Sequence, residues 1–230
     1  MGKLIYLDNA ATTKTAPEVV DAMLPYFTEH FGNPSSVYGF AAANKEVITK
    51  QREIIAKALG AKTEEIYFTA GGSESDNWAL KATAEAYESK GKHIITTKIE
   101  HHAILHTGEY LQKRGYEVTY LDVDENGVVD LEQLKAAIRP ETILVSVMFV
   151  NNEIGAVEPI AEIGELIKQV NPKTYFHVDA IQAYGKFRIL PKKMHIDMLS
   201  ASGHKIHGPK GTGFLYISEK MKIVPIIYGG

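Results

Sequence analysis

Residues 66–90 read IYFT-AGG-SESDNWALKATAEAYESK, a strand signal, a glycine turn and a helix signal in succession. Ile66 to Thr69 are apolar, aromatic or β-branched, which is typical of a short strand. Gly71 and Gly72 form the turn, and the residues that follow, to Lys90, have a helical period. This stretch therefore predicts a strand that passes directly into a helix.

The same alternation continues toward the C-terminus. We expect strands at 94–97, 117–121, 143–147, 175–178, 198–200 and 213–217, and helices at about 103–114, from the cap Asp130 onward, and at 160–170. Alternation of this kind predicts an α/β fold with a mainly parallel sheet flanked by helices. Before the first strand, residues 16–30 and 41–59 look helical and are joined by a loop at 32–36 that is rich in turn-forming residues.

The composition is that of an ordinary globular protein. Of the 230 residues, 45% are hydrophobic and 23% are charged, and 25 Lys and Arg against 28 Asp and Glu leave a formal net charge of -3. A chain of this length can bury about 70% of its unfolded surface, so one large domain is expected. The charge balance argues against a nucleic-acid partner and against binding to an anionic membrane.

Cysteine is absent from the sequence. Disulfides, thiolate zinc sites and a cysteine nucleophile from this chain are therefore excluded. The apolar run at 4–7 is too short for a signal-peptide core, and no stretch approaches a membrane span. We expect a cytoplasmic protein. We expect no metal site, because the histidines at 101, 102, 204 and 207 lack the spacing and the carboxylates of a metal motif.

A lysine follows the strand expected at 198–200, in the segment SASGHKIHGPKGTG at 200–213. Lys205 stands there among small residues, hydroxyls and histidines. Lysine amines with a lowered pKa form imines with carbonyl cofactors. A single turn of this kind more often holds a solvated lysine, so the motif needs support from other strand ends.

Three other strand ends supply that support. Asp179 ends an apolar strand and is suited to pair with a pyridinium nitrogen, although a helix cap or a satisfied core aspartate would look the same. Gly72 and Ser73 stand at a helix N-terminus, where amides bind phosphate. His101 follows another strand and could move protons near neutral pH, although a structural histidine is the common alternative. Ligands bind at this edge of parallel sheets, so the signals reinforce one another.

Together these segments resemble the cysteine desulfurases of the nitrogen-fixation and iron–sulfur-assembly types, within the class V aminotransferase family of pyridoxal-phosphate (PLP) enzymes. The lysine motif SGHKIHGPKG at 202–211 is the most specific match. Other matches keep the order of the family: YLDNAATT at 6–13, GNPSS at 32–36, GSESDN at 72–77, EH at 100–101, NNEIG at 151–155 and HVDAIQ at 177–182.

The resemblance implies a role for each matching residue. Lys205 would hold PLP as a Schiff base, and Asp179 would pair with the pyridine nitrogen. His101 would stack on the ring and take part in proton transfers. Asn152 and Gln182 would lie at the phenolic oxygen. The phosphate would be bound by Gly72, Ser73, Ser202 and His204.

The resemblance also implies the fold and the partners. The fold would be that of the large domain of fold type I PLP enzymes, over residues 16–230, with residues 1–15 joining a small domain that is largely absent. L-Cysteine would be the substrate, and the sulfur would pass to an acceptor or iron–sulfur scaffold protein. A homodimer is implied. In the family the nucleophilic cysteine and a substrate-binding arginine lie in the C-terminal region, so this chain alone would not complete a turnover.

Several alternatives stay open. The ending at 229–230 looks like a cut in a loop. We expect a truncated desulfurase rather than a split enzyme or a degenerate binder, because every residue that the resemblance places at the cofactor is present in this chain. Selenocysteine lyase or another class V PLP lyase is one alternative function, and a non-catalytic PLP-fold scaffold is another. A nucleotide-binding Rossmann protein is disfavoured, because the glycines at 208–213 have different spacing from its fingerprint.

Overall fold

The computed structural model describes residues 5–228, so the expectations for Leu4 and for Gly229 and Gly230 lie outside the described residues. The described chain forms a seven-stranded sheet in the order β1-β7-β6-β5-β4-β2-β3. The strands are β1 (Ile66–Thr69), β2 (His93–Thr97), β3 (Glu117–Leu121), β4 (Thr142–Met148), β5 (Tyr175–Asp179), β6 (Met198–Ser202) and β7 (Gly213–Ile217).

The sheet is mixed but mainly parallel, as predicted. β6, β5, β4, β2 and β3 pair in parallel, whereas β7 runs antiparallel to both of its neighbours, β6 and β1. The carboxyl ends of β2, β4, β5 and β6 therefore lie at one edge of the sheet. This edge brings together segments that are more than one hundred residues apart in the sequence.

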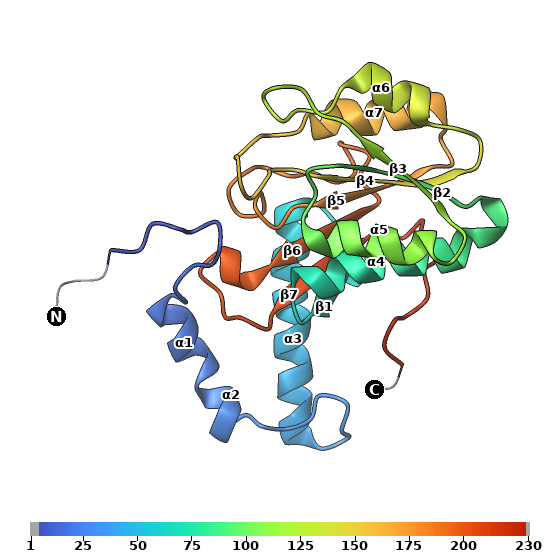
Figure 1. Cartoon of the computed structure of the whole chain (residues 1–230). Helices are drawn as coiled ribbons and strands as arrows, with labels where there is room; N and C mark the ends of the chain where they lie inside the picture. Colours follow the sequence, from blue (N-terminus) through green and yellow to red (C-terminus); the bar gives the residue numbers. More distant parts are fainter. Residues whose placement is uncertain (1–4, 229–230) are drawn as a thin grey trace.

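Helices cover both faces of the sheet (Figure 1). α4 (Gly72–Tyr87) and α5 (His102–Gln112) pack on one face, and α6 (Leu131–Ala137) and α7 (Ile160–Val170) pack on the other. Each layer closes its own apolar core: Leu80, Ile104 and Leu144 belong to the first, and Ile163, Phe176 and Val178 belong to the second. Asp130 caps α6 as predicted, with its Oδ1 accepting the Glu132 amide at 2.8 Å.

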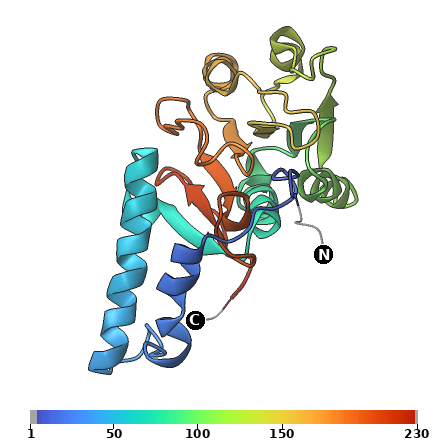
Figure 2. The same cartoon turned by 90° about the vertical axis from the view of Figure 1, so that its left-hand side faces the viewer.

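The helix expected at 16–30 is wrong in one respect, because the structure breaks it in two. α1 (Pro17–Met23) ends before Leu24, and α2 (Pro25–Thr28) begins at a proline. Proline has no amide hydrogen to continue the hydrogen-bond ladder, so it starts a new helix there. The long helix α3 (Gly39–Leu59) follows, and its lower part lies beside α1 and α2 as an arm that extends away from the sheet (Figures 1 and 2).

Short 3₁₀ turns complete the chain at η1 (Thr63–Glu65), η2 (Glu88–Lys90) and η3 (Gly203–Lys205). The turn η2 extends α4 to Lys90, where the sequence pattern places the helix end. None of the helices between residues 5 and 228 is both long and apolar enough to cross a membrane.

Candidate functional site

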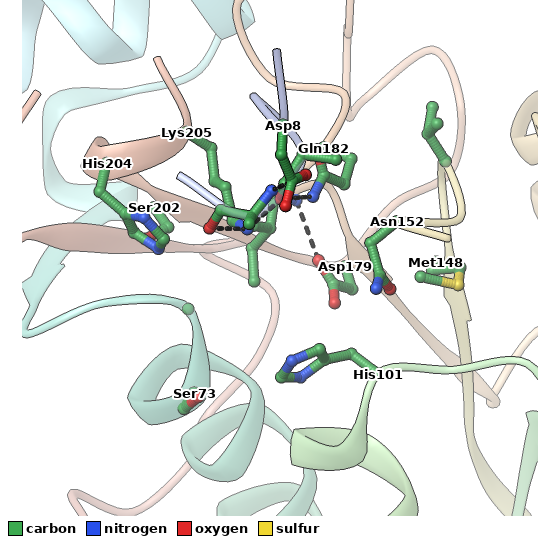
Figure 3. Close-up of a pocket in the computed structure, with 15 residues that line it drawn as sticks. Asp8, Ser73, His101, Met148, Asn152, Asp179, Gln182, Ser202, His204 and Lys205 are labelled. Carbon is green, nitrogen blue, oxygen red and sulfur yellow. Dashed lines mark hydrogen bonds between the residues drawn. The ribbon is translucent and has the colours of Figure 1, made fainter. Parts of the chain in front are cut away.

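A cavity of about 500 Å³ opens where β2, β4, β5 and β6 end. All the residues predicted to bind the cofactor line this cavity, and Figure 3 shows their side chains around it. They are Gly72, Ser73, His101, Asn152, Asp179, Gln182, Ser202, His204 and Lys205. The parallel topology explains this convergence, because each residue follows the carboxyl end of a strand or starts a helix at the same edge.

Lys205 ends the turn η3 directly after β6. The loop is tightly folded: a Cβ at Gly203 would lie 2.4 Å from Thr212 Oγ1, and His207 adopts a left-handed φ of 63°. Partial burial and the positive charge of Lys186 lower the pKa of Lys205, against the opposing effect of Asp8 and Asp179. A lysine amine with a lowered pKa is a better nucleophile near neutral pH.

The N-terminal strap, residues 8–13, lies over this lysine. Lys205 Nζ donates to the carbonyl of Ala10 and, at 2.7 Å, to that of Ala11. The Thr13 amide donates to the His204 carbonyl at 2.8 Å, which fastens the strap to η3. The strap therefore holds the amine at the cavity. The assignment of residues 1–15 to a separate small domain stays a prediction.

Asp179 is the last residue of β5 and is only 4% exposed. Its Oδ1 accepts the Ile181 amide at 2.9 Å, which orients the carboxylate at the cavity. Burial raises the pKa of Asp179 to about 6, although the Ile181 amide and the Lys205 charge act in the opposite direction. At neutral pH Asp179 is therefore mostly ionised inside the protein, where a cationic ring nitrogen would stabilise it.

Glycine at the first position of α4 lets the side chain of Ile181 pack closely against the N-terminus of the helix. A Cβ at Gly72 would lie 2.1 Å from Ile181 Cδ1 and 3.7 Å from Ser202 Cβ. The preceding Gly71 has a φ of 145°, a conformation that favours glycine. The first amides of a helix have no partner within the helix, so this end can bind an anion, with Ser73 and Ser202 beside it.

His204 lies next to that helix end and bonds the strap. Its Nδ1 is 3.0 Å from Thr12 Oγ1. Burial and the nearby charges of Lys205 and Lys210 lower the pKa of His204, so it stays largely neutral at pH 7. A neutral histidine can donate one hydrogen bond to an anion without adding charge.

His101 caps α5 and faces the same cavity. Its Nδ1 accepts the Ala103 amide at 3.1 Å, which leaves Nε2 as the nitrogen that carries the proton in the neutral ring. Partial burial, His102 and Lys205 lower the pKa of His101. The ring is therefore neutral near pH 7 and carries on Nε2 a hydrogen that it can donate in a hydrogen bond.

Asn152 and Gln182 complete the polar lining. The neighbouring Asn151 holds the loop that presents Asn152, since its Nδ2 donates to the Ile99 carbonyl at 2.8 Å and its Oδ1 accepts two amides of the loop. Gln182 is 8% exposed and donates to the Ala10 carbonyl at 2.8 Å. The strap therefore occupies hydrogen-bonding positions of both Gln182 and Lys205.

Sequence reasoning missed several residues of the cavity. Met148 ends β4 and Val150 follows it, and attention to the carboxyl end of every parallel strand would have found both. Ile181 closes the cavity beside Gly72, and Asp8 reaches it from the strap. No local signal identifies these two, because their position depends on contacts between distant segments.

Comparison with known proteins places this site in a family. The family model described as aminotransferase class-V matches residues 5–230. A cysteine desulfurase IscS from Clostridium botulinum (strain Kyoto / Type A2) is 59% identical over 230 residues, which cover 100% of this chain and 57% of that relative. The chain thus spans a little over half the length of the curated relatives that it matches.

Solved structures agree with this match. One described as a NIFS-like protein has a TM-score of 0.96 at 42% sequence identity, covering 98% of this chain and 62% of its own. Another, described as SspA in complex with cysteine, has a TM-score of 0.95 at 42% identity, covering 99% of this chain and 65% of its own. The predicted resemblance is confirmed: the chain belongs to the class V aminotransferase family of PLP-dependent enzymes and is a homologue of cysteine desulfurase IscS.

Proposed function

We propose that this chain binds pyridoxal 5'-phosphate and forms the cofactor-binding part of a cysteine desulfurase, which converts L-cysteine to L-alanine and passes the sulfur to an acceptor. One observation supports this most strongly. Lys205, with a lowered pKa, and the buried carboxylate of Asp179 line the same cavity. A cavity with an amine, a buried acid and a helix N-terminus matches the three functional groups of PLP: aldehyde, ring nitrogen and phosphate.

The residues present fit the cofactor. Ile181 packs closely against the first turn of α4 because Gly72 has no Cβ, and Gly72, Ser73 and Ser202 line the cavity at that turn. Gly72, Ser73, Ser202 and His204 would hold the phosphate through amides, hydroxyls and an imidazole. Asp179 would bind the protonated ring nitrogen, and Asn152 and Gln182 would lie at the ring oxygen. When bound there, the cofactor would supply an electron-withdrawing ring that stabilises negative charge on the amino-acid α-carbon.

The side chains of this chain would then do the following work. Lys205 would hold the cofactor through its amine, and the same amine would be the basic group nearest to a bound amino acid. Asp179 keeps the ring nitrogen protonated, because an ionised carboxylate in a buried site favours a neighbouring cation. His101 would present its Nε2 hydrogen to a bound substrate, and uptake of a proton would require release of Nδ1, whose lone pair accepts the Ala103 amide.

Cysteine as the substrate, and sulfur transfer, rest on similarity. The SspA structure, 42% identical, is described as a complex with cysteine. The 230 residues contain no cysteine, so a thiol that accepts the sulfur would have to come from outside them. A cysteine preference over selenocysteine, an acceptor or iron–sulfur scaffold protein as partner, and a cytoplasmic location stay predictions.

Covalent trapping tests the cofactor proposal. The protein is mixed with PLP, reduced with borohydride and digested, and the pyridoxylated peptide is identified by mass spectrometry. We expect label on Lys205, together with the visible absorbance of bound PLP before reduction. Both are lost in Lys205→Ala, whereas Lys193→Ala, an exposed lysine outside the cavity, keeps both. Label spread evenly over surface lysines would refute the proposal.

Sulfide and alanine release then separates the enzyme from the scaffold alternative. The PLP-loaded protein is given L-cysteine and a small thiol as sulfur acceptor, and both products are measured. Release of alanine supports the desulfurase function. PLP binding with no change in the absorbance of bound PLP when L-cysteine is added would favour the non-catalytic scaffold.

The surface of the arm supports the predicted homodimer. α1, α2, the loop that follows them and the start of α3 leave large apolar side chains exposed, and Phe27 and Phe31 are each 70% exposed. The exposed set in this arm comprises Val20, Leu24, Tyr26, Phe27, Phe31, Val37, Tyr38 and Phe40. Monomers rarely expose apolar patches of this extent, so we propose that a second copy covers it. Light scattering after gel filtration measures the mass, and Phe27→Asp with Phe31→Asp is expected to give the monomer.

A further inference from the structure

The face of α4 that packs on the sheet contains one acidic side chain. Asp76 is 0% exposed and follows Gly72 by one helical turn. The next buried residues of the same face include Ala79, Leu80 and Thr83, which pack in the core of this layer or against Met198. A carboxyl group at such a position replaces an apolar side chain, and its burial is costly unless it is paired or neutral.

In the described part of the chain, Asp76 has no cationic partner, and only the hydroxyl of Ser200 favours its charge. Among residues 5–228, neither carboxyl oxygen has a hydrogen-bond partner. The nearest basic group is His177, whose Nε2 lies 3.8 Å from Asp76 Oδ1. Both nitrogens of that ring are already bonded, Nδ1 to Ser146 Oγ and Nε2 to Ser200 Oγ, each at 2.9 Å. Burial lowers the pKa of His177 to about 3, so the ring is neutral and is no counter-ion.

The row formed by Ser146, His177 and Ser200 lies directly behind the cavity. His177 precedes Asp179 by two residues on β5, so both side chains point to the same face of the sheet. Asp76, on the helix that covers this face, lies against the row. Asp179 differs from Asp76 in having an amide partner at 2.9 Å and a cationic neighbour, Lys205.

The charged and titratable groups around Asp76 are few. β5 contributes His177 and Asp179, and the segment between β2 and α5 contributes Glu100, which is 4% exposed. β4 and β6 contribute the hydroxyls of Ser146 and Ser200. Burial, Asp179 and Glu100 raise the pKa of Asp76 well above its usual value, and they outweigh the opposing effect of Ser200.

We propose that Asp76 is a positioning residue that stays protonated behind the cavity, so that Asp179 ionises first and carries the negative charge that faces the cofactor. The role toward the cofactor rests on the proposed function. Two carboxyl groups in one desolvated region do not ionise together at low cost. The group with the amide partner and the nearby cation takes the charge, and the group with neither keeps its proton.

In the cofactor-free protein, Asp179 should lose its proton at a lower pH than Asp76. Protein labelled with ¹³C in its aspartate carboxyl groups is titrated by infrared spectroscopy, which detects the C=O stretch of protonated carboxyl groups. As the pH rises through the midpoint of Asp179, a second protonated aspartate band should remain in the wild type and be absent in Asp76→Asn. A wild-type spectrum with no such band would overturn the proposal without the need for any variant.

Reciprocal variants test the order itself. Asp76→Asn should leave the midpoint of Asp179 unchanged, because Asp76 is neutral throughout that titration. Asp179→Asn should lower the midpoint of Asp76 by about one pH unit or more, because it removes the negative charge that raises it. The opposite asymmetry, with Asp179 shifting in Asp76→Asn, would show that Asp76 ionises first. If one variant does not fold, the other and the wild-type titration still decide.

The pH dependence of stability provides an independent check. A carboxyl group with a raised pKa in the folded state stabilises the protein at low pH, and this stabilisation is lost as the pH rises toward the folded pKa. The unfolding constant of the wild type should therefore grow relative to that of Asp76→Asn by up to ~tenfold per pH unit above about pH 4. A constant ratio would contradict the proposal.

The titrations of Asp76 and Asp179 can succeed or fail independently of the test of PLP binding. The titrations use protein without PLP, so a protein that fails to bind PLP can still show this order of ionisation. Normal trapping of PLP on Lys205 combined with the reverse order would refute the role of Asp76 alone.

Discussion

Gly72→Ala tests whether the stability of the protein depends on the close packing of Ile181 against the first turn of α4. The added Cβ would lie 2.1 Å from Ile181 Cδ1 and 2.9 Å from Ile181 Cγ1, so the isoleucine has to move. Overpacking of this kind costs about 1–3 kcal/mol. A value of about 2 kcal/mol would lower the Tm of a chain of this size by roughly 4–8 °C. Urea unfolding and thermal unfolding measure both quantities.

Gly39→Ala is a matched control. Gly39 is also the first residue of its helix, but within the described chain a Cβ there would meet nothing within 4 Å. The gain in helix propensity is common to both variants, so the difference between them isolates the contact with Ile181.

Ile181→Val provides the second half of the test. It removes Cδ1, the atom nearest to the added Cβ, and alone it should cost about 0.5–1.5 kcal/mol. The double variant should lose about 1 kcal/mol less of its free energy of unfolding than the sum of the losses in the two single variants. Additive costs, or a Gly72→Ala variant as stable as Gly39→Ala, would refute the reasoning.

Two further predictions concern residues next to the cavity. Asn151→Ala removes three hydrogen bonds of a buried side chain and should lower the free energy of unfolding in urea by about 2–3 kcal/mol. It should also weaken PLP binding, because the loop that presents Asn152 is released. The control Asn126→Ala, in an exposed turn, should cost less than about 0.5 kcal/mol, and equal costs of the two variants would contradict the prediction. Burial raises the pKa of Glu100 to about 8, so the protonated carboxyl group stabilises the folded state at low pH. The wild type loses this stabilisation as the pH rises from about 4.5 to 8. Over that range the free energy of unfolding of Glu100→Gln should rise relative to that of the wild type by up to ~1.4 kcal/mol per pH unit. A pH-independent difference in unfolding free energy would show that Glu100 is ionised throughout.

Most of the fold could be predicted from local patterns. The strands at 66–69, 117–121 and 213–217 and the helix at 160–170 begin and end as predicted. Runs of apolar, aromatic and β-branched residues bounded by turn formers are strong strand signals, and they located both the outer strands β1 and β3 and the fully buried β7. The helix expected at 16–30 was wrong at Pro25, where the missing amide mattered more than the general helical period.

The sequence predicted which residues line the candidate site but not the hydrogen bonds that they make. Motifs at separate strand ends identified Lys205, Asp179 and His101, and parallel topology brings them to one cavity. The roles of these residues stay proposals. The hydrogen bonds from Lys205 to the strap, and the orphaned carboxyl group of Asp76, had no local signal.

The sequence by itself determined the alternation of strands and helices, the family resemblance and the identity of the residues that can contact a cofactor, because these depend on residue type and spacing along the chain. Only the tertiary structure decided which partners each group finds: Ala10 and Ala11 for Lys205, Ile181 for Asp179, and none for Asp76 within the described residues. The physical reason is that burial and charge act through space. The ionisation of a carboxyl group is set by neighbours that the fold brings from distant parts of the chain.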